Sequence, residues 1–172
     1  GTISERALTL LRVTEDALTR SIACARVGGR VSDLGHAVQQ HVEANGFSVV
    51  REFVGHGIGT KLHEEPQIPN YGEPGLGPRL TAGMVIAIEP MVNMGRADVR
   101  MLDDGWTAVT SDGSLSAHFE HTVAITMEGP VVLSTPLAPT EAIPTGDAGS
   151  VHAYAPTAGG PESNAGDTGR EW

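Results

Sequence analysis

The sequence has little sulfur and few aromatic rings. Cys24 is the only cysteine in 172 residues, which excludes a disulfide framework and a cysteine-rich metal cluster. No apolar run approaches the ~18 residues of a membrane span, and the first residues lack the charged start and apolar stretch of a signal peptide. We therefore expect no membrane partner and a cytoplasmic, reducing location.

Positive charge is also scarce. The chain has 11 lysines and arginines against 21 acidic residues, a formal net charge of −10. No basic stripe is available to neutralise phosphates, so nucleic acid is excluded as a direct partner. The hydrophobic content of 40% is enough for the core of one domain of this length.

The first part of the chain predicts two helices. Apolar residues recur at helical spacing from about residue 4 to 27, with Ser4 as the N-cap and Gly28-Gly29 as the stop. Ser32 is expected to cap a second helix, which Asn45-Gly46 ends.

Strand-like runs follow the helices. Turn signals at 103–105 and 111–113 suggest hairpin connections on either side of the run 106–111. Two helices followed by antiparallel strands predict an α+β layer architecture. The predicted strands are 47–54, 83–92, 106–111, 116–126 and 130–135.

The character of the chain changes after residue 134. Residues 135–172 hold 5 of the 11 prolines and 6 of the 22 glycines, without a sustained apolar period. Such a segment does not bury enough apolar surface to offset its ordering entropy. We predict a folded unit over 1–134 and a disordered tail over 135–172.

The stretch VGHGIGTKLHEEP, residues 54–66, places His56 and His63 in a glycine-rich backbone. Glycine costs a helix roughly 1 kcal/mol per position, so this stretch is interpreted as a strand end that runs into a loop. A phosphate-binding loop at Gly55–Lys61 is a weaker interpretation, because the order is Gly-Thr-Lys and no helix clearly follows.

Two glutamates interrupt strand-like runs. Glu89 lies within the apolar run GMVIAIEPMVNMG, where a bare carboxylate costs several kcal/mol unless it is paired or bound to a cation. Glu120 lies in SAHFEHTVAIT, where alternation puts Ser116, His118 and Thr122 on its face. One imidazole, that of His56, and these two carboxylates suit Mn²⁺, Fe²⁺, Co²⁺ or Zn²⁺.

Each of these residues has an alternative interpretation. A histidine in a glycine loop is often a hydrogen-bonded structural residue, and each glutamate is a candidate partner for an arginine such as Arg51 or Arg100. For each residue considered alone, the structural role is favoured over the role of metal ligand. Taken together, the three groups favour a metal site.

Three strings in this region resemble the type I methionine aminopeptidases: GHGIGTKLHEEPQIPNY, AGMVIAIEPMVN and DGWTAVTSDGSLSAHFEHTVAIT. With the leading SERAL…VTEDAL, the resemblance covers roughly residues 2–134. It implies an incomplete pita-bread fold, in which two helices pack on a curved, mainly antiparallel sheet. It also implies removal of N-terminal methionine from nascent chains by two divalent ions, drawn from Co, Mn, Fe, Zn or Ni.

The resemblance implies a role for four of these residues in the chemistry. His56 and Glu89 would ligate one metal ion, and Glu120 would bridge both. Glu89 would also accept the proton of the attacking water. His63 would contact the substrate and stabilise the tetrahedral intermediate.

Three further positions match residues around the family's site. Leu62 and Trp106 match positions that wall the methionine side-chain pocket, although relatives commonly have Phe at the position of Leu62. Ser116 matches a residue near a monovalent-cation site.

The family's site also has two aspartate ligands, which this chain does not match. We therefore expect one weakly bound metal ion and only part of a site. The expected partners are methionyl peptides of nascent chains, the ribosome, and a second copy through an exposed sheet edge. The alternative function is a non-catalytic pita-bread module that binds a peptide or a ribosomal partner. The aspartates ahead of the tail, none of which fits either motif, are Asp16, Asp33, Asp98, Asp103, Asp104 and Asp112.

Overall fold

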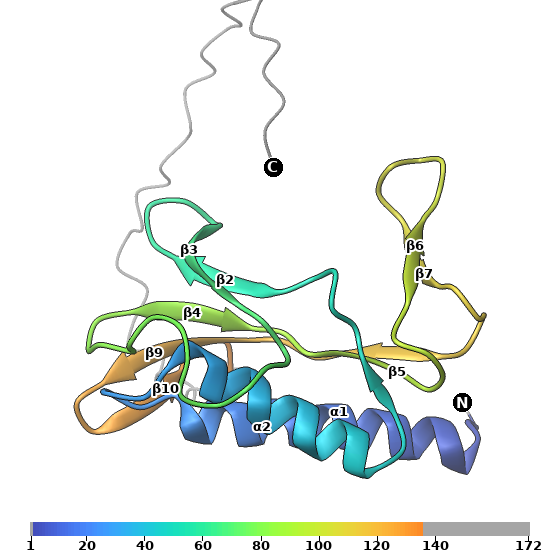
Figure 1. Cartoon of the computed structure of the whole chain (residues 1–172), viewed down its shortest axis with the longest axis horizontal. Helices are drawn as coiled ribbons and strands as arrows, with labels where there is room; N and C mark the ends of the chain where they lie inside the picture. Colours follow the sequence, from blue (N-terminus) through green and yellow to red (C-terminus); the bar gives the residue numbers. More distant parts are fainter. Residues whose placement is uncertain (1, 136–172) are drawn as a thin grey trace, which may run out of the picture. The chain divides into compact units, whose positions relative to one another are not determined.

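The computed structural model describes residues 2–135 (Figure 1). Apart from Thr135, the predicted tail over 135–172 lies outside the described residues. The boundary at 134 therefore stays a prediction.

The first helix begins where the sequence predicts. Helix α1 spans Glu5–Cys24, and the hydroxyl of Ser4 accepts a hydrogen bond from the amide of Ala7 at 3.2 Å, which satisfies one of the free amides of the first turn. The helix ends earlier than predicted, so Gly28 lies in the turn that follows, with φ +89°.

The second helix, α2, spans Val31–Ala44. Its end is confirmed: Asn45 is the C-cap, and Gly46 adopts φ +75°, a conformation that glycine reaches without steric cost.

The predicted N-cap of α2 is wrong. Arg30 occupies that position, and Asp33 accepts a hydrogen bond from its amide at 2.7 Å. Ser32 lies inside the first turn and uses its hydroxyl elsewhere. It donates to the carbonyl of Leu76 at 2.8 Å and accepts from the amide of Leu76 at 2.7 Å, so it ties the helix to the loop before the central strands.

Every strand pairing within the described residues is antiparallel, as expected. One sheet has the order β10-β9-β4-β2-β3, a second the order β1-β5-β8, and β6 and β7 form a hairpin of their own. The strands are β1 (Ser48–Val49), β2 (Gly55–Ile58), β3 (Glu64–Ile68), β4 (Val85–Ile88), β5 (Met91–Asn93), β6 (Val99–Met101), β7 (Ala108–Thr110), β8 (Ser116–His118), β9 (His121–Thr126) and β10 (Gly129–Val132).

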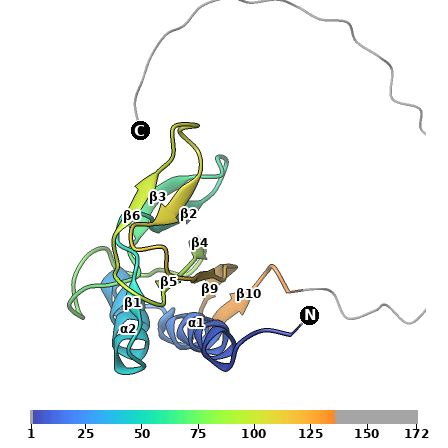
Figure 2. The ribbon, with the colours of Figure 1, turned by 90° about the vertical axis from the view of Figure 1, so that its right-hand side faces the viewer.

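The helices lie on one side of the strands, and the two hairpins extend away from the helices. Figures 1 and 2 both show α1 and α2 side by side, with the β2–β3 hairpin, which forms one edge of the larger sheet, and the β6–β7 hairpin projecting away from them. The helix-facing side is apolar and packs with α1 and α2 in two core clusters, one at the larger sheet and one at β1, β5 and β8. The fully buried strand residues of the first cluster are Ile68, Ile86, Ile88, Val123 and Ile125.

The structure has more strands than the five predicted runs, because some runs are interrupted. The runs 83–92 and 116–126 each divide into two strands, β4 with β5 and β8 with β9. Strands β3 and β6 were not predicted, and the turn at 111–113 joins strands of different sheets rather than a hairpin. Neither helix is long and apolar enough to cross a bilayer.

Gly35 of α2 lies against the backbone of the loop that follows β3. A Cβ atom there would lie 2.4 Å from the carbonyl oxygen of Pro69 and 2.6 Å from that of Tyr71. We predict that Gly35→Ala lowers the free energy of unfolding by about 1–3 kcal/mol through overpacking, although alanine favours a helix by about 1 kcal/mol.

Chemical unfolding measures this effect. The control is Gln40→Ala at an exposed position of the same helix, which should change the stability by less than about 0.5 kcal/mol. If Gly35→Ala is as stable as the original chain, the close packing described here is wrong.

Candidate metal centre

Glu89 and Glu120 face each other where two long strands are interrupted. Strand β4 pairs with β9, with Ile88 opposite His121, and β5 pairs with β8, with Met91 opposite His118. The register is the same on both sides of the break, so Glu89 lies opposite Glu120. Like charges directly opposite each other destabilise a sheet, so this pair needs a compensating group.

The backbone around Glu89 is held in place by neighbouring polar groups. The buried side chain of Asn70 donates a hydrogen bond to the carbonyl of Glu89 at 3.2 Å. Across the break, the amide of Phe119 donates to the carbonyl of Pro90 at 3.4 Å. These bonds support the interrupted segment where regular pairing stops.

Two imidazoles lie at the two oxygens of the Glu89 carboxylate. His56 Nε2 is 3.6 Å from Oε1, and His118 Nε2 is 3.8 Å from Oε2. Both separations exceed hydrogen-bond length. The Glu89 side chain is 14% exposed and that of His118 is 41% exposed, so the centre opens on the His118 side.

The orientation of His56 follows from its local backbone. The register of β2 with β3 shifts between His56 and Gly57, a bulge of the kind that redirects a side chain. His56 Nδ1 lies 2.9 Å from the carbonyl of Gly57. A carbonyl only accepts, so Nδ1 is the donor in this contact and Nε2 is the nitrogen that faces Glu89.

The group that can hold a metal ion differs from the predicted one. Glu89, His118 and Glu120 each offer one ligand atom, and these atoms all lie within 4.8 Å of one another. His56 is close to Glu89 but is not part of this group. His118 was not predicted as a site residue. The sequence feature that could have identified His118 is its position two residues before Glu120, on the same face of the predicted strand.

His63 lies beside His56. Their ring centroids are 4.2 Å apart with an interplanar angle of 61°. Glu64 holds the turn between β2 and β3 by accepting from the amide of Lys61 at 2.8 Å and from the hydroxyl of Thr60 at 3.1 Å. The structure therefore places His63 next to a candidate ligand, and its substrate role stays a prediction.

The arginine alternative for the two glutamates is wrong. Within residues 2–135, no arginine lies within ion-pair distance of Glu89 or Glu120. The guanidinium of Arg51 instead lies over the ring of Tyr71, 5.1 Å from its centroid. Arg100 is exposed on β6.

Burial and repulsion both act on Glu89. Burial raises the pKa of its carboxyl above the ordinary value of 4.5, the charge of Glu120 raises it further, and His56 opposes the shift. In the metal-free protein, the charged form of Glu89 is therefore disfavoured. A bound cation would stabilise this charged form.

The predicted substrate residues lie on the two hairpins. Leu62 lies in the turn of β2–β3 and is 69% exposed, and Trp106 lies in the turn of β6–β7 and is 87% exposed. The hydroxyl of Ser116 donates to the carbonyl of Val92 at 3.2 Å, and Ser116 lines a cavity of about 510 Å³ between β5, β8 and the β6–β7 hairpin. Leu62 and Trp106 are therefore exposed on the hairpin turns, and their place in a methionine pocket stays a prediction.

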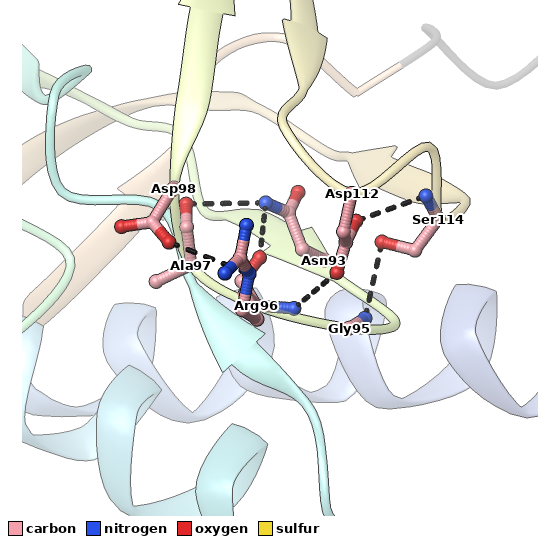
Figure 3. A network of polar contacts seen from close by, with 7 residues as sticks. All are labelled: Asn93, Gly95, Arg96, Ala97, Asp98, Asp112 and Ser114. Carbon is pink, nitrogen blue, oxygen red and sulfur yellow. Dashed lines mark hydrogen bonds and ion pairs between the residues drawn. The ribbon is translucent and has the colours of Figure 1, made fainter.

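A polar network fixes the base of the β6–β7 hairpin (Figure 3). Asn93 donates to the carbonyls of Arg96 and Ala97 at 2.9 and 3.2 Å. Asp112 accepts from the amides of Arg96 and Ser114 at 2.8 and 3.0 Å. The Arg96 amide and Ser114 lower the pKa of Asp112 to about 2, so the carboxylate stays charged and holds the start of β8 in place.

Two carboxylates and two imidazoles gathered on one face of an antiparallel sheet are side chains of the kind that bind divalent first-row metal ions. The model of metallopeptidase family M24 matches residues 1–127. The chain belongs to this family.

Relatives with high sequence identity are methionine aminopeptidases. The chain is 60% identical to that of Clostridium perfringens over 134 residues, which cover 78% of this chain and 54% of the relative. It is 57% identical to methionine aminopeptidase 1 of Bacillus subtilis over 129 residues, which cover 75% and 52%. The chain therefore spans about half the length of the curated relatives that it matches.

The structural comparison agrees. The crystal structure of the methionine aminopeptidase of Thermotoga maritima matches with a TM-score of 0.78 and 51% identity, over 79% of this chain and 55% of that one. The predicted α+β architecture, an incomplete pita-bread fold, is confirmed.

The raised pKa of Glu89 predicts a pH-dependent stability. A carboxyl whose pKa is raised in the folded state destabilises that state as pH rises from the unfolded value of 4.5 through the folded value. In the metal-free chain, Glu89→Gln should raise the thermal midpoint at pH 7, and the gain should shrink as pH falls toward 4.5.

Thermal unfolding in the presence of a chelator measures the gain. Glu73→Gln, at an exposed glutamate, is the control and should show no gain at either pH. A lower midpoint for Glu89→Gln at pH 7 would contradict the electrostatic account.

Proposed function

We propose that this chain carries part of the active site of a methionine aminopeptidase, which removes N-terminal methionine from nascent proteins. The observation that carries the proposal is the facing pair Glu89 and Glu120 with imidazoles at the same carboxylate. The 60% identity to a relative named methionine aminopeptidase supports the reaction class.

The donor set fits the metal that the family implies. His56 and Glu89 would hold one divalent ion, and Glu120 would bridge it to a second. When bound, such ions supply a nucleophilic water at neutral pH and polarise the scissile carbonyl. The resemblance to the family implies that these ions are drawn from Co, Mn, Fe, Zn and Ni.

The chain's own residues have separate tasks in the proposed reaction. Glu89 accepts the proton of the attacking water, a task that its raised pKa suits. His63, whose ring lies against that of His56, faces the substrate and donates to the carbonyl oxygen as negative charge develops there.

The two hairpins supply the proposed substrate contacts. Leu62 and Trp106 project apolar side chains from the turns of β2–β3 and β6–β7, and would enclose the methionine side chain together with the rest of the site. Ser116 would contribute to a monovalent-cation site. A substrate on nascent chains implies a cytoplasmic location and contact with the ribosome.

The exposed apolar side chains also favour a second candidate, a non-catalytic module that binds a peptide or ribosomal partner. Leu62 and Trp106 would serve such binding without cleavage. The facing glutamates argue against this candidate, because a pure binding module gains nothing from two opposed carboxylates.

Sheet edges are expected to make the isolated chain associate with itself. Strands β3 and β10 form the two edges of the larger sheet among the described residues. Val131 and Leu133 are exposed along one of these edges, and an unpaired apolar edge is a surface for a second copy.

A peptidase assay tests the proposed function. The chain alone should not release methionine from a Met-Gly or Met-Ala peptide above background, since it lacks both aspartate ligands that the family's site implies. Co-expression with the aspartate-bearing part of a homologous methionine aminopeptidase should restore measurable cleavage.

Glu89→Ala and His56→Ala should each abolish the restored cleavage, and Glu73→Ala, at an exposed position, should retain it. Release of methionine by the lone chain at roughly 1 s⁻¹ or faster would contradict the account of an incomplete site. Cleavage that survives Glu89→Ala would contradict the proposed role of that carboxylate.

A further inference from the structure

His118 stands out among the polar side chains near the glutamates because nothing in the proposed reaction uses it. It ends strand β8, two residues before Glu120, and its Nε2 lies 3.8 Å from Oε2 of Glu89. Among residues 2–135 its ring has no hydrogen-bond partner. Its imidazole is therefore free to act as a ligand.

The distances fit coordination of one ion. Bonds of about 2.0–2.2 Å from carboxylate oxygen and imidazole nitrogen place neighbouring ligand atoms of a tetrahedral shell about 3.4 Å apart. The atoms of Glu89, His118 and Glu120 lie within 4.8 Å of one another. The His118 side chain is 41% exposed, so its ring has room to turn toward the two carboxylates.

The two imidazoles approach different oxygens of one carboxylate. His56 Nε2 faces Oε1, and His118 Nε2 faces Oε2. Only His118 joins Glu89 and Glu120 in a group with all ligand atoms mutually close. Glu89 can therefore share an ion with His118 and Glu120 without His56.

We propose that His118 is a ligand of a divalent ion that this chain binds by itself, with Glu89 and Glu120 as the other protein ligands. The inference rests on the proposed metal role of the two glutamates and adds a residue that this role does not include. One nitrogen and two carboxylate oxygens, with water completing the shell, favour a first-row transition ion over Mg²⁺.

Cobalt titration of the full chain tests the proposal, with calorimetry for the affinity and visible absorption for the ligand set. His118→Ala should weaken Co²⁺ binding at least tenfold, the lower end of the loss seen when partners of metal ligands are removed. His121→Ala is the matched control. His121 lies three residues after His118, and its ring makes a hydrogen bond with the hydroxyl of Ser134 at 2.9 Å, outside the metal group. The Co²⁺ affinity of His121→Ala should therefore match that of the original chain.

A cysteine at each position distinguishes coordination from a general electrostatic effect. His118→Cys should give a near-ultraviolet Co²⁺–thiolate absorption band, because a thiolate replaces the imidazole as ligand. His121→Cys should not give this additional band. Cys24 is common to all variants and sets the background.

The outcomes separate this inference from the proposed function. If Glu89→Gln and Glu120→Gln weaken binding while His118→Ala changes it less than threefold and His118→Cys gives no band, His118 is no ligand and the proposed function is unaffected. If none of the three substitutions changes the affinity, the metal role of the glutamates fails as well. Absence of Co²⁺ binding at millimolar concentration overturns the claim that this chain holds an ion alone.

Discussion

The opposition of Glu89 and Glu120 across an antiparallel ladder is the constraint on which the rest of this structure depends. Their positions follow from the register that β4 keeps with β9 and β5 keeps with β8. Burial of Glu89 and repulsion from Glu120 disfavour the charge of Glu89, which is expressed in its raised pKa. Binding of a divalent cation converts this repulsion into attraction to a shared ion, so the destabilising pair and the proposed metal site are two aspects of one arrangement.

The opposite face of the same strands supplies the stability that such a pair requires. Ile86, Ile88 and Val123 are buried against the helices, and burial of large aliphatic side chains contributes about 1.5–3 kcal/mol each. The glutamates thereby lie between strands that are anchored in the core, at the breaks between β4 and β5 and between β8 and β9. The hairpin turns that carry His63 and Trp106 are exposed. Rigid placement of ligands beside exposed loops is a common arrangement for a binding site.

The sequence was informative where a local rule decides the structure. Ser4 and Gly46 mark helix ends through capping and backbone conformation alone. Ser32 failed as a cap because its hydroxyl bonds Leu76, 44 residues away, a tertiary contact that no local pattern reveals. In the site, Glu89 and Glu120 were identified from their unusual surroundings, whereas His118 was missed because its closeness to Glu89 depends on cross-strand register.

A double-mutant cycle of Glu89→Gln and Glu120→Gln, measured as the free energy of unfolding with chelator and with saturating Mn²⁺, tests the central claim most directly. We predict a repulsive coupling energy between the two carboxylates without metal, and a coupling of the opposite sign with Mn²⁺, because each carboxylate then depends on the other to hold the ion. A coupling energy near zero under both conditions would contradict the account.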